Sequence, residues 1–269
     1  MNKTDLKDEA IVPRANVLGV GVSAINLEEA VELLLAAAES GKKGYVCVTG
    51  VHGVSEAQND PEFRNILNAA FLNTPDGMPM SWVGRLQGNR AMDRVYGPDL
   101  MRDLSKAGVP REARHFYYGG KEGVAEELKR KMEERFPGIQ IVGTYTPPFR
   151  PLNEEEENAL VERVAQLRPD FFWVGLSTPK QERFMSQYWR KLDAKIFFGV
   201  GAAFDMHAGQ VLQAPYWMQR SGLEWLFRLI VEPRRLWKRY MINNPLFLGR
   251  IALQFSGLRK YEIPPSSNR

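Results

Sequence analysis

The chain has 269 residues, of which 44% are hydrophobic and 25% charged, a composition typical of a folded globular protein. Its single cysteine, Cys47, excludes an intramolecular disulfide, and with only three histidines beside it the chain is poorly equipped for a structural zinc site. The formal net charge is +4, and five arginines and one lysine against two glutamates give the same excess between Glu224 and Arg250 alone. The positive charge is therefore local, which points to an anionic partner for this region.

The start of the chain shows no signal for export or membrane insertion. Residues 1–14 are polar and charged, lack the apolar core of a signal peptide and are expected to be flexible. No uncharged apolar run reaches the roughly 18 residues that a spanning helix needs. We therefore expect a protein that stays on the cytoplasmic side of the membrane.

Strands and helices are predicted to alternate over residues 15–209. A strand is expected at 17–22, and Asn26 with Glu29 predicts a capped helix that runs to residue 39. Further strands are expected at 45–49, 71–75, 115–118, 139–143, 171–175 and 195–200, and helices at 53–58, 61–70, 80–86, 99–107, 123–135, 154–167 and 180–190. This alternation indicates a Rossmann-like α/β fold, with a mostly parallel sheet and helices on both faces.

The character of the chain changes after Gly209, and residues 210–258 are expected to form a basic, amphipathic helical appendage. Apolar residues recur at helical spacing from Leu226 to Met241, and Pro233 interrupts them, which predicts two short helices. Cations beside aromatic and aliphatic residues are typical of a segment that lies on an anionic membrane. A helix packed on the domain, or a surface for homo-oligomers, would give the same pattern. Nucleic acid is disfavoured as a partner, because the rest of the chain is balanced in charge. Residues 259–269 are expected to be a disordered tail.

Ligands of open parallel sheets bind beyond the carboxyl ends of the strands, where we expect residues 49–53, 74–79, 119–123 and 175–182. Asp76 stands on a turn restricted by two prolines and a glycine, and it could act as a general base or simply cap the next helix. His52 could bind a phosphate or transfer a proton, or it could be structural. The pair Gly119 and Gly120 ends another strand.

The segment 175–182 predicts a helix start, with Thr178 as the N-cap and a proline after it. Free N–H groups there, together with Lys180, would suit a diphosphate, but Gln181 could instead close a capping box. Around Gly201 the chain resembles the start of a dinucleotide fingerprint without its third glycine, which favours a tight turn.

The candidate site also includes charged residues of both signs. Arg94 and Asp99 could be ligand contacts, an ion pair or a helix cap. The chain contains no Asp-x-Asp, the pair with which many nucleotide-sugar enzymes hold a divalent cation. This favours a site without metal or cofactor, in which cationic side chains and N–H groups neutralise the leaving group.

Taken together, six segments resemble the WecG/TagA/CpsF family of glycosyltransferases over roughly residues 17–248. They are Thr74-Pro75-Asp76-Gly77-Met78-Pro79, Arg94-Val95-Tyr96-Gly97-Pro98-Asp99-Leu100, Gly175-Leu176-Ser177-Thr178-Pro179-Lys180-Gln181-Glu182, Gly199-Val200-Gly201-Ala202-Ala203-Phe204-Asp205, Ala214-Pro215 and Gly222-Leu223-Glu224-Trp225-Leu226-Phe227-Arg228-Leu229. The resemblance implies an inverting, metal-independent transfer of N-acetylmannosamine, its uronic acid or a related sugar. The implied donor is a UDP-sugar, and the implied acceptor is a polyprenyl-diphosphate-linked sugar used for cell-surface polymers or exopolysaccharide.

The resemblance also assigns roles to individual residues. Asp76 matches the family's proposed base and Gln181 a proposed donor-binding glutamine. The arginine-rich segment resembles an appendage that docks on the membrane and completes the site, with Arg228, Arg234, Arg235 or Arg239 reaching the diphosphate. The family commonly has Thr-x-Asn after the second strand; this chain has no Asn there, so Thr49 or His52 would make that contact. Two other functions fit the residues alone: a nucleotide-dependent oxidoreductase and a non-enzymatic scaffold on the membrane.

Overall fold

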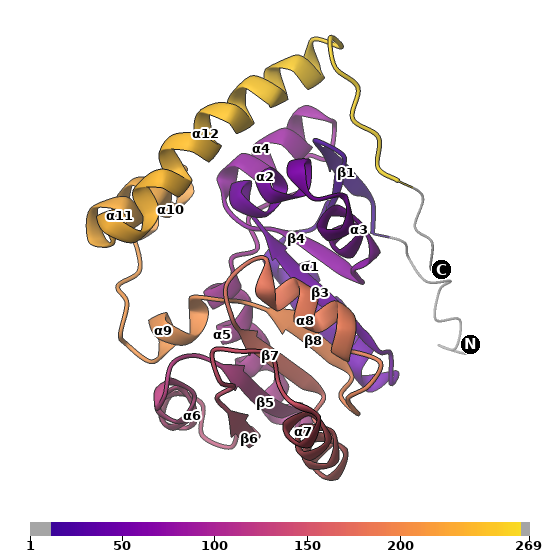
Figure 1. The fold of residues 1–269 in the computed structure, drawn as a ribbon, viewed down its shortest axis with the longest axis vertical. Coiled ribbons are helices and arrows are strands. Elements are labelled where there is room, and N and C mark those ends of the chain that lie inside the picture. The colour runs from indigo at the N-terminus through magenta and orange to yellow at the C-terminus, as the bar shows by residue number, and fades with distance from the viewer. Residues whose placement is uncertain (1–11, 265–269) are drawn as a thin grey trace, which may run out of the picture.

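Six strands that pair in parallel form the central sheet of the computed structural model, which describes residues 12–264 (Figure 1). In spatial order they are β4 (Leu72–Pro75), β3 (Gly44–Thr49), β8 (Ile196–Gly199), β7 (Phe171–Gly175), β5 (Arg114–Gly119) and β6 (Gln140–Tyr145). Each lies within three residues of its predicted bounds, because the short apolar runs between turn residues leave few alternatives.

Helices cover both faces of this sheet, as predicted. One face packs against α1 (Leu27–Glu39), α5 (Gly97–Gly108), α6 (Val124–Arg135) and α9 (Ala203–His207), and the other against α2 (Val51–Asn59), α3 (Pro61–Ala69), α7 (Glu154–Leu167) and α8 (Lys180–Tyr188). Strand β7 shows why both faces need a cover: Phe171 and Trp173 enter one core, while Phe172 and Val174 enter the other. The Rossmann-like architecture is thus confirmed.

Local capping signals fix two helix starts. Asn26 and Glu29 form the predicted capping box of α1, and Asn153 forms one with Glu156 at the start of α7. The Thr178 prediction is wrong: α8 begins at Lys180 without a side-chain cap, and the Thr178 hydroxyl donates to Glu182 instead. Helix α4 (Met78–Leu86) follows β4, and one turn of 3-10 helix, η1 (Val109–Arg111), follows α5.

The first predicted strand, 17–22, is also wrong. The chain forms an antiparallel hairpin of β1 (Arg14–Val17) and β2 (Val20–Ser23), separate from the main sheet. Leu18 and Gly19 turn the chain with φ angles of 55° and 83°, the left-handed values that tight hairpins require. The sequence gives no polar signal for this turn, because every residue from Val17 to Val22 is buried, as in one continuous strand.

The appendage consists of α10 (Tyr216–Arg220), α11 (Glu224–Val231) and α12 (Pro233–Phe255) and lies across one end of the sheet domain (Figure 1). The predicted break at Pro233 is confirmed, but two short helices are not, since α12 runs for 23 residues and contains Pro245. Pro245 cannot donate the backbone hydrogen bond of a helix. The helix continues through it because packing compensates for that loss: α12 buries Leu236, Tyr240 and Phe247 and lies against α2.

Hydrogen bonds join the end of α12 and the residues after it to the β1–β2 hairpin. The Gln254 amide nitrogen donates to the Asn16 carbonyl at 2.8 Å, and the Asn16 amide donates to the Tyr261 carbonyl at 2.6 Å. Residues 259–264 are therefore described and partly packed, contrary to the predicted disordered tail from 259 on. The rest of that prediction (265–269) and most of the predicted flexible start (1–11) lie outside the described residues.

Candidate functional site

A cavity of about 460 Å³ lies between the ends of β3 and β4 and the appendage. Residues 48–53 and 76–79 supply its floor, α4 and α8 contribute side walls, and α11 and α12 cover it. Of the predicted site residues, Thr49, His52, Asp76 and Arg228 line this cavity. The site is therefore composed of three parts of the chain that are far apart in sequence, within residues 48–86, 178–182 and 219–251.

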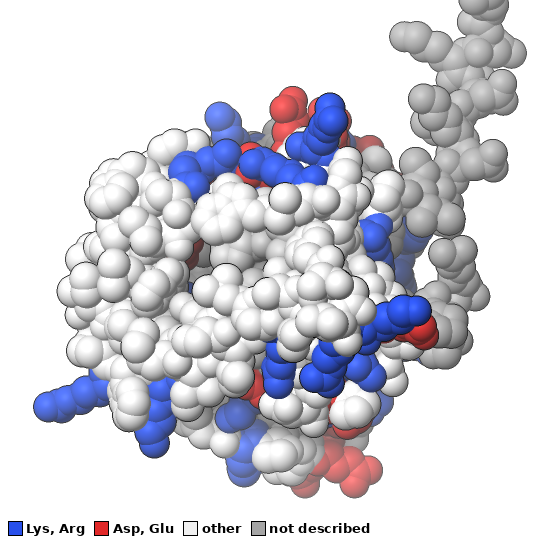
Figure 2. Space-filling model, turned by 90° about the horizontal axis from the view of Figure 1, so that it is seen from above, with Lys and Arg blue, Asp and Glu red and all other residues white. Residues whose placement is uncertain are grey.

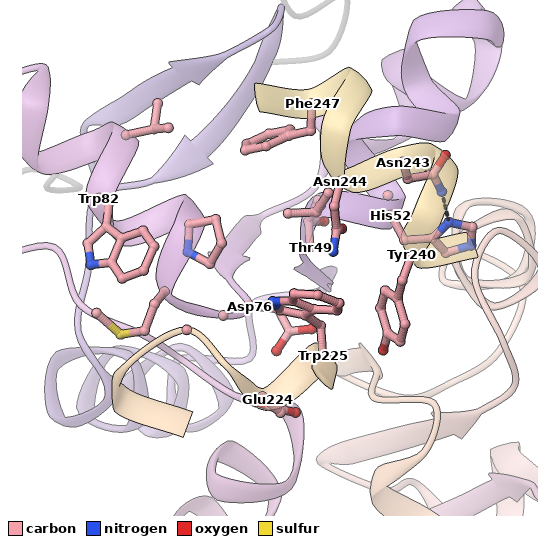
Figure 3. Close-up of a pocket in the computed structure, with 18 of the residues that line it drawn as sticks. Thr49, His52, Asp76, Trp82, Glu224, Trp225, Tyr240, Asn243, Asn244 and Phe247 are labelled. Atoms are coloured by element: carbon pink, nitrogen blue, oxygen red, sulfur yellow. Dashed lines mark hydrogen bonds between the residues drawn. The ribbon is translucent and has the colours of Figure 1, made fainter. Parts of the chain in front are cut away.

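Backbone contacts fix the position of Asp76. Its N–H donates to the Thr49 carbonyl at 3.0 Å, and the preceding carbonyl, of Pro75, accepts from the Val95 N–H at 2.8 Å. A Cβ at Gly50 would lie 3.0 Å from the Asp76 carbonyl oxygen, so glycine allows the two strand ends to approach. Helix α4 has Gly77 as its N-cap and no side-chain cap. Asp76 is thus not a helix cap, and its side chain lies at the cavity (Figure 3).

The protein surroundings raise the pKa of Asp76 to about 7, through burial first and then through the nearby Glu224 carboxylate. Arg94, Arg228 and Arg239 act in the opposite direction without cancelling this effect. A carboxylate that exchanges its proton near neutral pH is suited to general base catalysis at physiological pH.

Arg94 connects the sheet domain to the appendage. The buried guanidinium donates to Glu224 at 2.8 Å and to Asp99 at 3.3 Å, and it lies 3.9 Å from the centre of the Tyr96 ring. Asp99 also accepts from Arg102 at 2.9 Å. Arg94 and Asp99 therefore form the ion pair that the sequence allowed, and they stand behind the cavity wall rather than on it.

Two arginines of the appendage face the cavity. Arg228 comes from α11 and Arg239 from α12, both half-buried. The Nε atoms of both are buried and have no hydrogen-bond partner among the described residues. Neighbouring guanidinium groups with spare N–H donors can bind a diphosphate. The predicted Arg235 instead lies outside the cavity, where it donates to Glu232 at 2.6 Å.

His52 links α2 to α12. The Asn243 amide nitrogen lies 3.3 Å from His52 Nδ1, and Glu56 lies 3.6 Å from the same atom. Burial, followed by the charge of Arg239, lowers the pKa of His52 to about 4. The imidazole is therefore neutral near pH 7 and can donate or accept hydrogen bonds at the cavity without carrying charge.

The segment after β7 is arranged differently from the expected anion site. The N–H groups of Lys180 and Gln181 both donate to the Ser177 carbonyl, and the Lys180 side chain is exposed away from the cavity. The Gln181 side chain is buried behind the wall and donates to Glu182 at 3.0 Å. Glu182 lines the cavity, and burial raises its pKa.

The three predicted glycines also stand outside the cavity lining. Gly119 has a φ of 124°, and a Cβ there would lie 2.7 Å from Gly175, so its role is close packing of β5 on β7. The Gly120 N–H donates to the Gly175 carbonyl at 3.0 Å. Gly201 adjoins the Gln181 side chain.

Most of the cavity residues that the appendage supplies were not singled out by sequence reasoning as ligand contacts. For Tyr240 the helical spacing gave a signal, since it follows the buried Leu236 by four residues. The missed residues include Glu224, Trp225, Tyr240, Asn243 and Asn244 (Figure 3).

Comparison with known proteins found a matching family and similar relatives, two of which have the same description. The model of the "Glycosyl transferase WecG/TagA/CpsF family" matches residues 15–261. An N-acetylglucosaminyldiphosphoundecaprenol N-acetyl-beta-D-mannosaminyltransferase of Bacillus subtilis (strain 168) is 31% identical over 191 residues, which cover 71% of this chain and 72% of the relative. A protein of the same description from Bacillus spizizenii (strain ATCC 23059 / NRRL B-14472 / W23) is 31% identical over 196 residues, 73% of this chain and 74% of the relative.

Proposed function

Because the chain belongs to the WecG/TagA/CpsF family of glycosyltransferases, we propose that it moves an N-acetylhexosamine-type sugar from a UDP donor to a polyprenyl-diphosphate-linked acceptor. N-acetylmannosamine, its uronic acid or a related sugar would be transferred. The names of the two Bacillus relatives support an N-acetylmannosaminyl group and a lipid diphosphate acceptor. Membership of an enzyme family rules out the scaffold, and a glycosyltransferase family rules out the oxidoreductase.

The observation that carries the proposal is the meeting of Asp76 with Arg228 and Arg239 in one cavity. Asp76 takes the proton from the acceptor hydroxyl, whose oxygen attacks the anomeric carbon from the face opposite to UDP. The bond from that carbon to the diphosphate breaks, so the configuration inverts and UDP leaves. The guanidinium groups offset the charge that develops on the leaving diphosphate. This supports a reaction without a metal ion, in agreement with the missing Asp-x-Asp.

The appendage is the part of the enzyme that would meet the membrane. Among residues 12–264, no helix is both long and apolar enough to cross a bilayer. Large apolar side chains are nevertheless exposed on α10 to α12, and the face seen in Figure 2 is largely uncharged, with lysines and arginines at its edges. Such a face suits peripheral binding to an anionic, cytoplasmic membrane surface. The exposed side chains include Tyr216, Trp217, Ile230, Trp237 and Leu246.

A direct test combines donor and acceptor panels. Purified enzyme is incubated with UDP-sugars and short polyprenyl-diphosphate-linked acceptors, and products are identified by mass spectrometry, with the anomeric configuration read by NMR. We expect one UDP-N-acetylhexosamine or its uronic acid to be transferred with inversion. Transfer from another nucleotide sugar only, or retention of configuration, would refute the proposal. Sedimentation with anionic vesicles tests the membrane part, and a Trp217→Ser/Ile230→Ser variant should sediment less.

A further inference from the structure

The cavity has two chemically different ends. Charged and polar side chains surround Asp76 on one side, among them Arg228, Arg239 and Tyr240. In Figure 3, Tyr240 and His52 lie on the opposite side of the cavity from Trp82. The cavity lining also includes apolar side chains from α4 and α12, among them Trp82, Val83, Leu86, Phe247, Leu248 and Ile251.

These six residues give the cavity two apolar walls, one on α4 and one on α12. On α4, Leu86 follows Trp82 and Val83 by four and three residues, and Ile251 follows Phe247 and Leu248 of α12 in the same way, so each set lies on one side of its helix. Packing contacts fix the position of both walls. Phe247 is buried in the core, and a Cβ at Gly222 would lie 2.5 Å from the Trp82 ring, so the turn before α11 presses against the indole.

The apolar end opens outward. Leu86 is 73% exposed and Leu248 is 66% exposed, although both line the cavity. Together with the other apolar residues of the two walls these leucines form a groove, and an exposed apolar groove is typical of a surface that an apolar partner covers. Neither a nucleotide nor a sugar has an apolar part long enough to cover them.

We infer that the groove between α4 and α12 binds the first isoprene units of the acceptor's lipid chain. This inference rests on the proposed function, in which the acceptor hydroxyl lies at Asp76. The groove is continuous with the cavity that contains Asp76. A chain attached to the acceptor's diphosphate can therefore run from the reacting end to the mouth at Leu86 and Leu248. A membrane lipid that is not the acceptor would, in contrast, contact only the exposed mouth of the groove at Leu86 and Leu248.

Acceptors with one head group and isoprenoid tails of increasing length test this inference. They are assayed as monomers, without vesicles or detergent. We expect kcat/KM to rise by about tenfold or more over the first added isoprene units, because apolar surface is buried, and then to become constant once the tail leaves the groove. Tail length without effect on kcat/KM would overturn the inference and leave the proposed function intact. No turnover with any acceptor would overturn the proposed function itself.

Matched double variants separate the groove from general surface binding. Leu86→Ser/Leu248→Ser changes side chains that are mostly exposed, so the fold should tolerate it, and it should flatten the rise of kcat/KM with tail length. Leu212→Ser/Leu258→Ser changes two leucines with 71% and 80% exposure outside the cavity, and it should keep the rise. An equal loss in both double variants would overturn the groove assignment, and so would a full rise in the first.

Discussion

The Arg94 guanidinium donates a hydrogen bond of 2.8 Å to the Glu224 carboxylate, and this bond joins the loop before α5 to the first turn of α11. A second ion pair, Arg220 with Asp93 at 3.0 Å, lies beside it on the surface. Both pairs hold the appendage against the sheet domain, at the point where α11 brings Arg228 to the cavity. We therefore propose that Arg94 affects the site by positioning the appendage.

The two ion pairs should differ in their effect on stability. Arg94→Ala leaves the carboxylates of Glu224 and Asp99 without their buried partner, which should lower the free energy of unfolding by roughly 3 kcal/mol. Arg220→Ala breaks an exposed pair and should cost less than about 1 kcal/mol. Urea denaturation of both variants measures the difference, and equal losses would contradict the assigned role of Arg94.

Glu224 should also set the pH dependence of the reaction. Transfer requires the ionised form of Asp76, so kcat/KM should fall as the pH drops below about 7. The Glu224 charge is the second cause of the raised pKa, after burial. Glu224→Gln should therefore move the midpoint of the pH profile to lower pH. A midpoint that stays near 7 in this variant would separate Glu224 from the titration of Asp76.

The raised pKa of Asp76 should also make the stability of the folded protein depend on pH. In the unfolded chain Asp76 ionises near its ordinary value of 3.8, but in the folded protein it keeps its proton up to about pH 7. The wild type should therefore lose stability relative to Asp76→Asn as the pH rises from 4 to 7, with no further change above 7. Thermal unfolding of both proteins across this range measures the effect. A constant difference in melting temperature would show that the Asp76 carboxyl titrates normally.

Arg239 and Arg235 offer a matched pair on one helix. Arg239→Ala should weaken UDP binding by roughly 10- to 100-fold, the usual effect of losing hydrogen bonds to a charged group. Arg235→Ala should have little effect, because this side chain is exposed and paired with Glu232. Isothermal titration with UDP and with uridine tests both points: the loss should appear for UDP and be absent for uridine. The reverse order of the two variants would place the diphosphate elsewhere.

The sequence predicted the sheet domain better than the site. Apolar runs between turn residues located every strand of the main sheet, and the helix predicted at 154–167 has the same bounds as α7. The hairpin at Leu18–Gly19 and the passage of α12 through Pro245 depend on packing between distant segments, which local patterns do not contain. Asp76 and Thr49 could be placed at the cavity from their strand ends, whereas Glu224 and Tyr240 reach it only because the appendage folds back over it.

The variant Asp76→Asn tests most directly whether Asp76 is the base of a site that the appendage completes. Asparagine keeps the shape of the side chain and cannot accept the proton. With the identified donor and acceptor, we expect kcat to fall by roughly 10²- to 10⁴-fold, while UDP affinity and the folded structure are retained. Turnover close to that of the wild type in this variant would contradict the account.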